Sequence, residues 1–197
     1  NLARAVYSTL WRFVDYVRNR KIRKTPRQKS QAKKEYKKPV NISIVPLHTT
    51  VNVSEFANNF YNAINKKGAT YLATPQKALE QKNKKQDNIS TQQALTYWID
   101  ETEANHEFLL FEAEHESTEW TKRCIRQADV VMLLADATAT PNLTPIDELK
   151  STNSLPTLAQ HHLILMHSTQ TLLPSGTAKW LQQRPWVTQH YHLKHND

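Results

Sequence analysis

From Val40 onward, short apolar runs alternate with amphipathic segments, and this alternation restricts the fold more than any other feature of the chain. The run Val130–Ala135 (VVMLLA) has no polar residue, which is typical of a strand buried on both faces. Strands that alternate with helices predict an α/β fold, here a three-layer sandwich around a mostly parallel sheet of about six strands. The predicted strands are Asn41–Leu47, Thr70–Ala73, Phe108–Glu112, Val130–Ala135, His162–Met166 and His190–Leu193.

The segments between the strands carry signals for helix starts and ends. Asn52 and Glu55 form a capping box for the first helix, and Gly68 is positioned to end it. The polar stretch Gln81–Asn88 predicts an exposed loop. The later helices are predicted from Thr74-Pro75, over Thr91–Glu103, from a Ser117 cap to Gln127, from Thr144-Pro145, and over Thr177–Gln183 after a Ser175 cap.

Positive charge is concentrated before the predicted sheet. Residues 1–39 contain 13 of the 26 Lys and Arg side chains and only two carboxylates, so their net charge is +11. The whole chain has a net charge of +8, and residues 40–197 therefore have a net charge of −3. Residues 1–17 predict an amphipathic helix, residues 18–39 a basic flexible linker, and residues 40–197 the α/β domain. The apolar stripe of the first helix consists of Leu2, Val6, Leu10, Phe13 and Val17.

Three kinds of partner fit the basic linker: anionic lipid, the phosphate backbone of nucleic acid, or an acidic protein surface. A solvated spacer without a partner is the alternative. Tyr36 is the linker's one aromatic residue and no nucleic-acid-binding motif is present, which argues against nucleic acid. The stretch Asp100–Glu119 has eight carboxylates and no Lys or Arg, and predicts a solvated acidic rim on which the linker could dock. The candidate contacts for an anionic surface are Arg18, Arg20, Lys21, Arg23 and Lys24.

The loop after the first strand is where a parallel sheet binds nucleotides, so it decides whether an NTPase is possible. A phosphate-binding loop needs G-x-x-x-x-G-K-[ST], yet the chain has only two glycines, both outside this loop. Started at Pro46, the template meets Val51, Asn52 and Val53 at its last three positions, and started at Leu47 it meets Asn52, Val53 and Ser54. Both glycines and the lysine are missing in either register. Asp136 ends a buried strand like a magnesium-binding acid, but such an aspartate is more often a turn residue. We expect no catalytic, cofactor or metal site in this segment.

Cysteine and histidine patterns favour packing over chemistry. Cys124 is the only cysteine, which excludes an internal disulfide. On a helix it shares a face with Trp120, near basic side chains that could lower its thiol pKa, but packing is the favoured interpretation. The nine histidines show no metal-ligand spacing. With no transmembrane run and no signal peptide, we expect a cytoplasmic piece of a longer protein.

The string Trp120–Asp129 (WTKRCIRQAD) is specific enough to indicate a family. With the strand that follows, it resembles the W-T-x-R-C-x-R-Q-A-D segment of neuropathy target esterase and its bacterial relatives, the patatin-like lysophospholipases that carry cyclic-nucleotide-binding domains. The resemblance covers about residues 41–193, with further similar pieces in the same order. These pieces are Ile44–Leu47, Ser54–Phe56, Leu163–His167, Lys179–Leu181, Arg184–Trp186 and His190–Leu193.

The resemblance implies a degenerate P-loop NTPase-like domain. Its partners would be the adjacent cyclic-nucleotide-binding and patatin domains of the same polypeptide, and the helix at residues 1–17 would end the preceding domain. The Ser–Asp dyad of the family lies beyond this chain. The segment is therefore expected to be a non-catalytic linker or regulatory domain of a lysophospholipase peripheral to a membrane. A nucleotide-binding switch without hydrolysis and a membrane-surface adaptor are the alternatives.

Five side chains of the string form a candidate motif. Trp120 is predicted to anchor its helix on the sheet. Arg123 and Arg126 lie about one helical turn apart, and they could clamp a carboxylate of a neighbouring domain or pair within this one. Cys124 and Asp129 complete the motif, for which an interface role and an internal structural role are both open.

Overall fold

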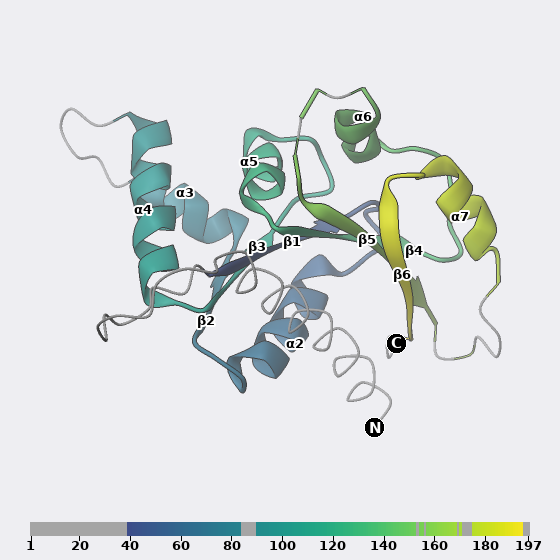
Figure 1. The fold of residues 1–197 in the computed structure, drawn as a ribbon, viewed down its shortest axis with the longest axis horizontal. Helices are drawn as coiled ribbons and strands as arrows, with labels where there is room; N and C mark the ends of the chain where they lie inside the picture. Colours follow the sequence, from purple (N-terminus) through teal and green to yellow (C-terminus); the bar gives the residue numbers. More distant parts are fainter. Residues whose placement is uncertain are drawn as a thin grey trace, which may run out of the picture.

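The computed structural model describes residues 39–83, 90–152, 154–155, 157–168, 170 and 175–194. The predicted helix at residues 1–17 lies outside the described residues. Pro39 is the only described residue of the basic linker, so the five candidate contacts lie outside the described residues as well. The described strands form one sheet in the order β2-β3-β1-β4-β5-β6 (Figure 1). The strands are β1 (Val40–Pro46), β2 (Thr70–Ala73), β3 (Phe108–Glu112), β4 (Val130–Asp136), β5 (Gln160–His167) and β6 (Val187–Lys194).

The predicted α/β class with about six strands is confirmed. All neighbouring strands of the described sheet pair in parallel, so the sheet is wholly rather than mostly parallel. Helices connect the strands in alternation, as parallel pairing requires. The described helices are α2 (Val53–Asn65), α3 (Pro75–Asn83), α4 (Thr91–Asn105), α5 (Glu119–Gln127), α6 (Pro145–Ser151) and α7 (Thr177–Gln183).

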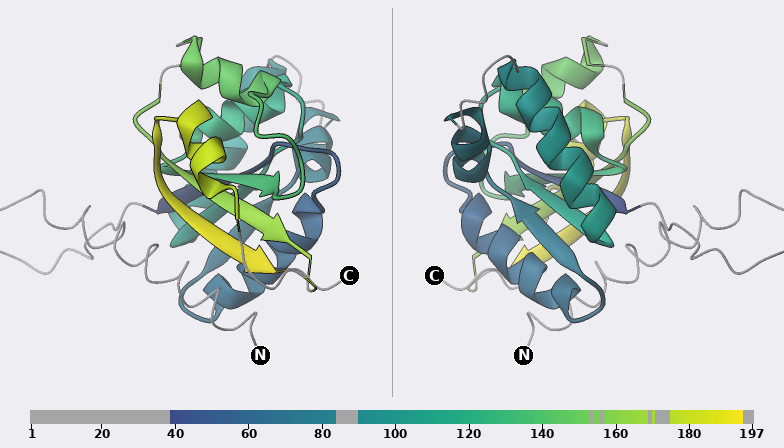
Figure 2. Two further views of the ribbon diagram at one scale, coloured as in Figure 1. Left: turned by 90° about the vertical axis from the view of Figure 1, so that its right-hand side faces the viewer. Right: turned by 90° about the vertical axis from the view of Figure 1, so that its left-hand side faces the viewer.

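The helices divide unequally between the two faces of the sheet. Figure 2 shows α2 on one face, whereas the other described helices lie on the opposite face. The crowded face holds an apolar cluster that includes Phe111, Leu133 and Trp180. On the α2 face, Phe60 and Met132 belong to a second cluster. Both faces of the central strands are therefore buried, which explains their nearly continuous apolar sequence.

Helix caps follow the sequence signals with two corrections. Asn52 Oδ1 accepts a hydrogen bond from Glu55 N at 3.0 Å, as predicted for the start of α2. Helix α5 is capped by Thr118, whose Oγ1 accepts from the helix at 3.1 Å, rather than by Ser117. Helix α7 has Gly176 at its N-cap with φ of 82° instead of the predicted Ser175. In both cases a neighbouring residue of similar capping preference takes the position.

Gly68 does not itself end α2, because it lies two residues beyond the C-cap Lys66. Among the described glycines only Gly176 has a positive φ, and the helix ends at a right-handed Lys66. Gly68 is instead a point of close approach. A Cβ there would lie 2.9 Å from both Glu107 Oε1 and Phe108 Cε2. The glycine therefore lets the turn pass over the start of β3.

The predicted acidic rim and exposed loop need partial correction. Glu112 is only 7% exposed, and Glu103 Oε1 accepts a hydrogen bond from Asn41 Nδ2 at 2.6 Å, so these two carboxylates are not solvated rim residues. Helix α3 continues through Asn83, into the segment predicted as a loop. Within the described part of the chain, no helix has the length and apolar character to cross a membrane.

Candidate functional site

The loop after β1 lies at the switch point of the sheet, where chain connections leave in opposite directions. Strand β1 is central and pairs with β3 on one side and β4 on the other. In open α/β sheets, ligands bind outside the carboxyl ends of the strands at such a point. The candidate site therefore consists of the loop at residues 47–54 and the ends of β3 and β4.

Ser54 and Glu112 pair across this site. Ser54 Oγ donates a hydrogen bond of 2.6 Å to Glu112 Oε1 at the end of β3. Ser54 occupies the Ser/Thr position of the phosphate-loop template started at Leu47. In P-loop enzymes this hydroxyl and a strand-end aspartate hold the magnesium ion. The acid that pairs with the hydroxyl is Glu112, a residue that the sequence reasoning did not single out for this site.

Asp136 forms a second hydroxyl–carboxylate pair at the same edge. Its Oδ2 accepts from Thr50 Oγ1 at 3.0 Å, and its Oδ1 accepts from Thr138 N at 2.8 Å and Thr138 Oγ1 at 2.6 Å. Burial opposes ionisation of Asp136, but the hydrogen bonds from Thr138 and Thr50 outweigh it and lower its pKa. The bonds to Thr138 N and Oγ1 identify Asp136 as a turn residue.

The side chains at the loop are poorly suited to a phosphate group. Asn52 occupies the template position of the second glycine, and its side chain caps α2. Val53 occupies the template position of the lysine. His48 is half-buried with its ring edge-on to Trp180, the centroids 5.7 Å apart. Burial lowers the pKa of His48, so it is neutral at pH 7 and adds no positive charge. Carboxylates rather than cations therefore dominate the loop's surroundings.

The start of the Trp120–Asp129 motif fixes the strand end that carries Glu112. Trp120 is 5% exposed, and its Nε1 donates to Glu112 O at 2.9 Å. Thr121 Oγ1 accepts from Glu114 N at 3.1 Å. The tryptophan therefore anchors α5 as predicted, and the threonine beside it holds the chain just after β3. Sequence reasoning identified the motif but missed the strand end that it holds.

The motif does not form one site, because its remaining members separate along α5. Arg123 donates to Gln92 Oε1 at 2.5 Å and to Thr96 Oγ1 at 3.2 Å on α4, whereas Arg126 is exposed. Cys124 is 0% exposed and burial raises its thiol pKa, which excludes an activated nucleophile.

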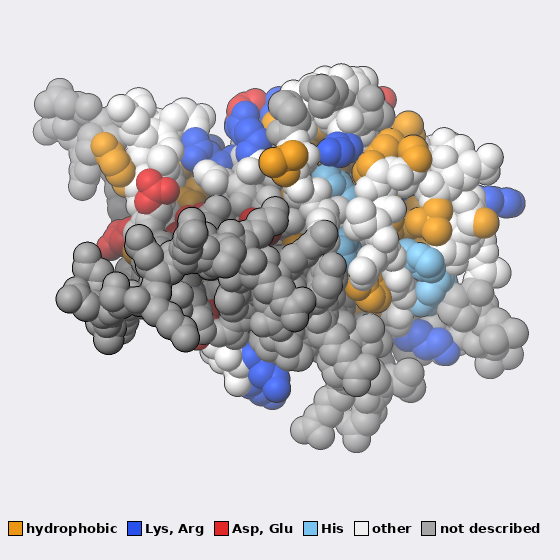
Figure 3. Space-filling model, viewed as in Figure 1, with side chains coloured by type: hydrophobic (Ala, Val, Ile, Leu, Met, Phe, Trp, Pro, Cys, Tyr) orange, Lys and Arg blue, Asp and Glu red, His pale blue; other side chains and the backbone are white. Residues whose placement is uncertain are grey.

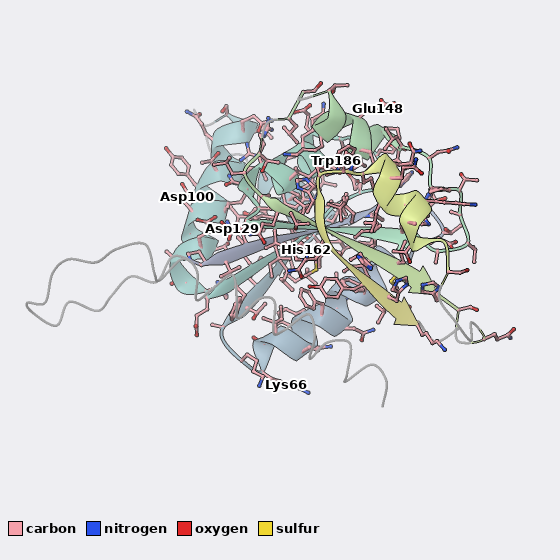
Figure 4. The ribbon with its side chains drawn as sticks, turned by 45° about the vertical axis from the view of Figure 1, so that its right-hand side comes forward. Lys66, Asp100, Asp129, Glu148, His162 and Trp186 are labelled. Atoms are coloured by element: carbon pink, nitrogen blue, oxygen red, sulfur yellow. The ribbon has the colours of Figure 1, made fainter. Side chains whose placement is uncertain are left out.

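Asp129 lies at the opposite, amino edge of the sheet (Figure 4). Its Oδ2 accepts from Asn41 N at 2.9 Å, and its own N–H donates to Asn41 O at 2.8 Å. These two bonds lock the start of β1 to the residue before β4. The motif thus runs from one edge of the sheet to the other, and Asp129 has a structural contact that the sequence did not predict.

Histidines gather at the β6 edge, visible as a pale-blue patch in Figure 3. His167 Nε2 and His192 Nδ1 are 2.8 Å apart in a hydrogen bond, and His192 Nε2 lies 3.2 Å from Thr177 Oγ1. Burial lowers the pKa of both histidines. No group of three or more metal-ligating side chains with suitable geometry occurs among the described residues.

The fold and the switch-point loop define a class of protein domain: a P-loop-like α/β domain whose phosphate loop has lost its glycines and lysine. Residues 39–197 match the model of the Neuropathy Target Esterase family P-loop like domain, and the chain belongs to this family. The sequence resemblance is thereby confirmed.

Similar proteins carry esterase or phospholipase names. They include patatin-like phospholipase domain-containing protein 7 of Rattus norvegicus, 29% identical over 158 residues, 79% of this chain and 12% of that protein. Lysophospholipase NTE1 of Kluyveromyces lactis is 30% identical over 155 residues, which are 78% of this chain and 11% of that protein. Neuropathy target esterase sws of Drosophila persimilis is 27% identical over 153 residues, which are 77% of this chain and 10% of that protein. The chain thus spans 10–12% of the length of these relatives.

Proposed function

We propose that this chain is a non-catalytic linker or regulatory domain of a patatin-like lysophospholipase. The loop after β1 carries the proposal, because Asn52 and Val53 stand where a phosphate loop started at Leu47 needs its second glycine and its lysine. Val53 in place of the lysine leaves incoming phosphate without a counter-charge, next to Glu112 and Asp136. The domain therefore keeps the architecture of an NTPase without its chemistry.

The names of the relatives support a hydrolase as the parent protein. We infer that this parent cleaves acyl esters of phospholipids or lysophospholipids, with a Ser–Asp dyad outside the present chain. The adjacent cyclic-nucleotide-binding and patatin domains would be its partners, in a protein that is cytoplasmic and peripheral to a membrane. Arg126 is the motif side chain best placed to contact a neighbouring domain, because it is exposed on α5.

An esterase assay tests the non-catalytic assignment. The purified 197-residue chain and its full-length parent are assayed on the same lysophospholipid. We expect turnover by the parent alone, since the inferred Ser–Asp dyad lies outside this chain and burial raises the thiol pKa of Cys124. Turnover by the isolated chain that survives repeated purification would refute the assignment.

A nucleotide-binding switch without hydrolysis is the second candidate, favoured by the retained hydroxyl–acid pair at Ser54 and Glu112. Calorimetric titration with Mg-ATP and Mg-GTP distinguishes it from an inert scaffold. A Kd tighter than about 100 µM, weakened by Ser54→Ala, would establish the switch. We expect no such binding.

A membrane-surface adaptor is the third candidate, favoured by the +11 charge of residues 1–39. Co-sedimentation with vesicles that contain anionic lipid compares the native chain with a variant in which the five linker candidates are alanine. Salt-sensitive binding that the variant loses would support the adaptor. Absent or salt-insensitive binding would count against it.

A further inference from the structure

Half of the α2 face of the sheet has no described helix packed on it. Helix α2 packs against β1, β2 and β3 on this face. The other described helices lie on the opposite face, as Figures 1 and 2 show, and contribute to the apolar cluster there. Among the described elements, the α2-facing sides of β5 and β6 therefore lack the helical layer that a three-layer sandwich needs.

Three side chains on this half are nevertheless buried. Ile164 and His162 on β5 are both 0% exposed, and Leu193 on β6 is 4% exposed. The His162 ring stacks on Tyr191 with centroids 5.8 Å apart, and Figure 4 shows His162 on the side of the sheet that faces α2. Side chains stand roughly perpendicular to a sheet, so neighbouring strands cover their flanks but not their tips. Ile164 and Leu193 share an apolar cluster with Phe56 and Phe60 of α2, which packs over the other half of this face. The burial of Ile164 and His162 points to a cover over β5 beyond α2.

We propose that the amphipathic helix predicted over residues 1–17 forms this layer. Its stripe from Leu2 to Val17 is apolar throughout and extends over about 22 Å of helix. Strands β5 and β6 have eight residues each and extend over about 26 Å. The helix is thus nearly as long as the strands, and its apolar stripe suits a contact with Ile164 and Leu193.

The connection between this helix and β1 permits the contact. Strand β5 is the second neighbour of β1 in the sheet, a separation of about 10 Å. The linker from residue 18 to residue 38 would span about 25 Å on average as a flexible chain. The tether therefore reaches β5 and β6 without strain and keeps the helix at a high effective concentration beside them.

This packing would make the helix part of the α/β domain as well as its connection to whatever precedes it. A movement of the preceding domain that pulled the helix away would expose Ile164 and the His162–Tyr191 stack. The contact between the helix and strands β5 and β6 would then depend on the position of the preceding domain, which is part of the proposed function.

A spin label on the polar face of the helix tests the contact in the whole 197-residue chain. Ser8→Cys, in a chain that also carries Cys124→Ala, places the label opposite the apolar stripe. We expect paramagnetic broadening of signals from β5 and β6, including Ile164, and none from α6 on the other face. Absence of broadening at β5 and β6 would overturn the proposal. So would broadening seen only between spin-labelled and isotope-labelled chains in a mixture, since that would assign the face to a second copy.

A pair of charge-matched variants provides a second readout. Leu10→Glu places a carboxylate in the stripe, whereas Ser8→Glu places it on the polar face. We expect Leu10→Glu to raise amide exchange rates in β5 and β6 at least tenfold and Ser8→Glu to leave them unchanged. Equal effects of the two variants would contradict the proposal, and if Leu10→Glu unfolds the whole chain the spin label decides.

Discussion

Arg184 and Asp147 form a fully buried ion pair that joins the end of α7 to α6. The distances are 2.9 Å between Nε and Oδ1 and 2.6 Å between Nη2 and Oδ2, and both side chains are 0% exposed. Arg184 also donates to the carbonyl oxygens of Pro141 and Asn142, each at 2.9 Å. Thr144 donates to the carboxylate through both N and Oγ1. These bonds replace the water that both charges lose on burial.

Removing one partner of this pair should be strongly destabilising. Arg184→Met leaves an unpaired buried carboxylate, and we expect the free energy of unfolding to fall by about 3–5 kcal/mol. Denaturant titration measures the change. Lys179→Met on the exposed surface of α7 is the matched control and should change stability by less than about 0.5 kcal/mol. Asp147→Leu and the double variant Asp147→Leu/Arg184→Met complete a double-mutant cycle, in which we expect the double variant to cost less than the sum of the two single variants. Additive costs would show that the two charges are not coupled.

Acid should destabilise the domain through two buried histidines. Burial lowers the pKa of His161 and of His162 to about 4 from the ordinary 6.5. Between these values the unfolded chain binds protons that the folded chain does not. The free energy of unfolding should therefore fall as pH drops from 6.5 to 4, by up to about 1.4 kcal/mol per pH unit for each histidine, and these histidines should add no slope above 6.5.

Denaturant titrations at a series of pH values measure this slope. His162→Phe keeps a ring against Tyr191 but cannot titrate, so it should reduce the slope by up to about 1.4 kcal/mol per pH unit. His115→Gln changes an exposed histidine and should leave it unaltered. An unchanged slope in His162→Phe would rule out His162 as a source of the acid sensitivity.

The indole hydrogen bond of Trp120 should contribute measurably to stability. Trp120→Phe keeps an aromatic ring in the core but leaves Glu112 O without the bond from Nε1. We expect a loss of about 1–3 kcal/mol in the free energy of unfolding. Trp186→Phe is the control, because Trp186 Nε1 is buried without a hydrogen-bond partner. A cost for Trp186→Phe as large as that for Trp120→Phe would show that ring size, not the bond, sets the loss.

The two glycines should respond to alanine for different reasons. Gly68→Ala places a Cβ 2.9 Å from Phe108 Cε2, and we expect overpacking to cost about 1–3 kcal/mol. Gly176→Ala meets nothing within 4 Å but must hold φ near +82°, which costs about 1–2 kcal/mol. Gly176→Asn separates the mechanisms, because asparagine tolerates this backbone and should recover part of the loss. A neutral Gly68→Ala would contradict the close approach.

Local sequence determined the class of fold because hydrophobic period and caps act over a few residues. Val130–Ala135 could only be a central strand, and Asn52 with Glu55 marked the start of α2 correctly. The missing phosphate loop was also readable, since Asn52 and Val53 stand at the second glycine and the lysine of the template. Errors at caps such as Ser117 were one residue in size, because adjacent polar residues have similar capping preferences.

Tertiary structure alone decided which distant side chains meet. Sequence reasoning compared Asp136 with a magnesium-binding acid and favoured a turn role, which its bonds from Thr138 support. The strand order put Glu112 next to Ser54, 58 positions away in the chain. Arg184 and Asp147 lie 37 positions apart, and nothing local indicates that this arginine is buried. Such pairs depend on the register and order of strands, which arise from packing over the whole sheet. The sequence thus specified an α/β domain whose first loop lacks the glycines and the lysine of a phosphate loop. The tertiary structure specified the Ser54–Glu112 contact at that loop.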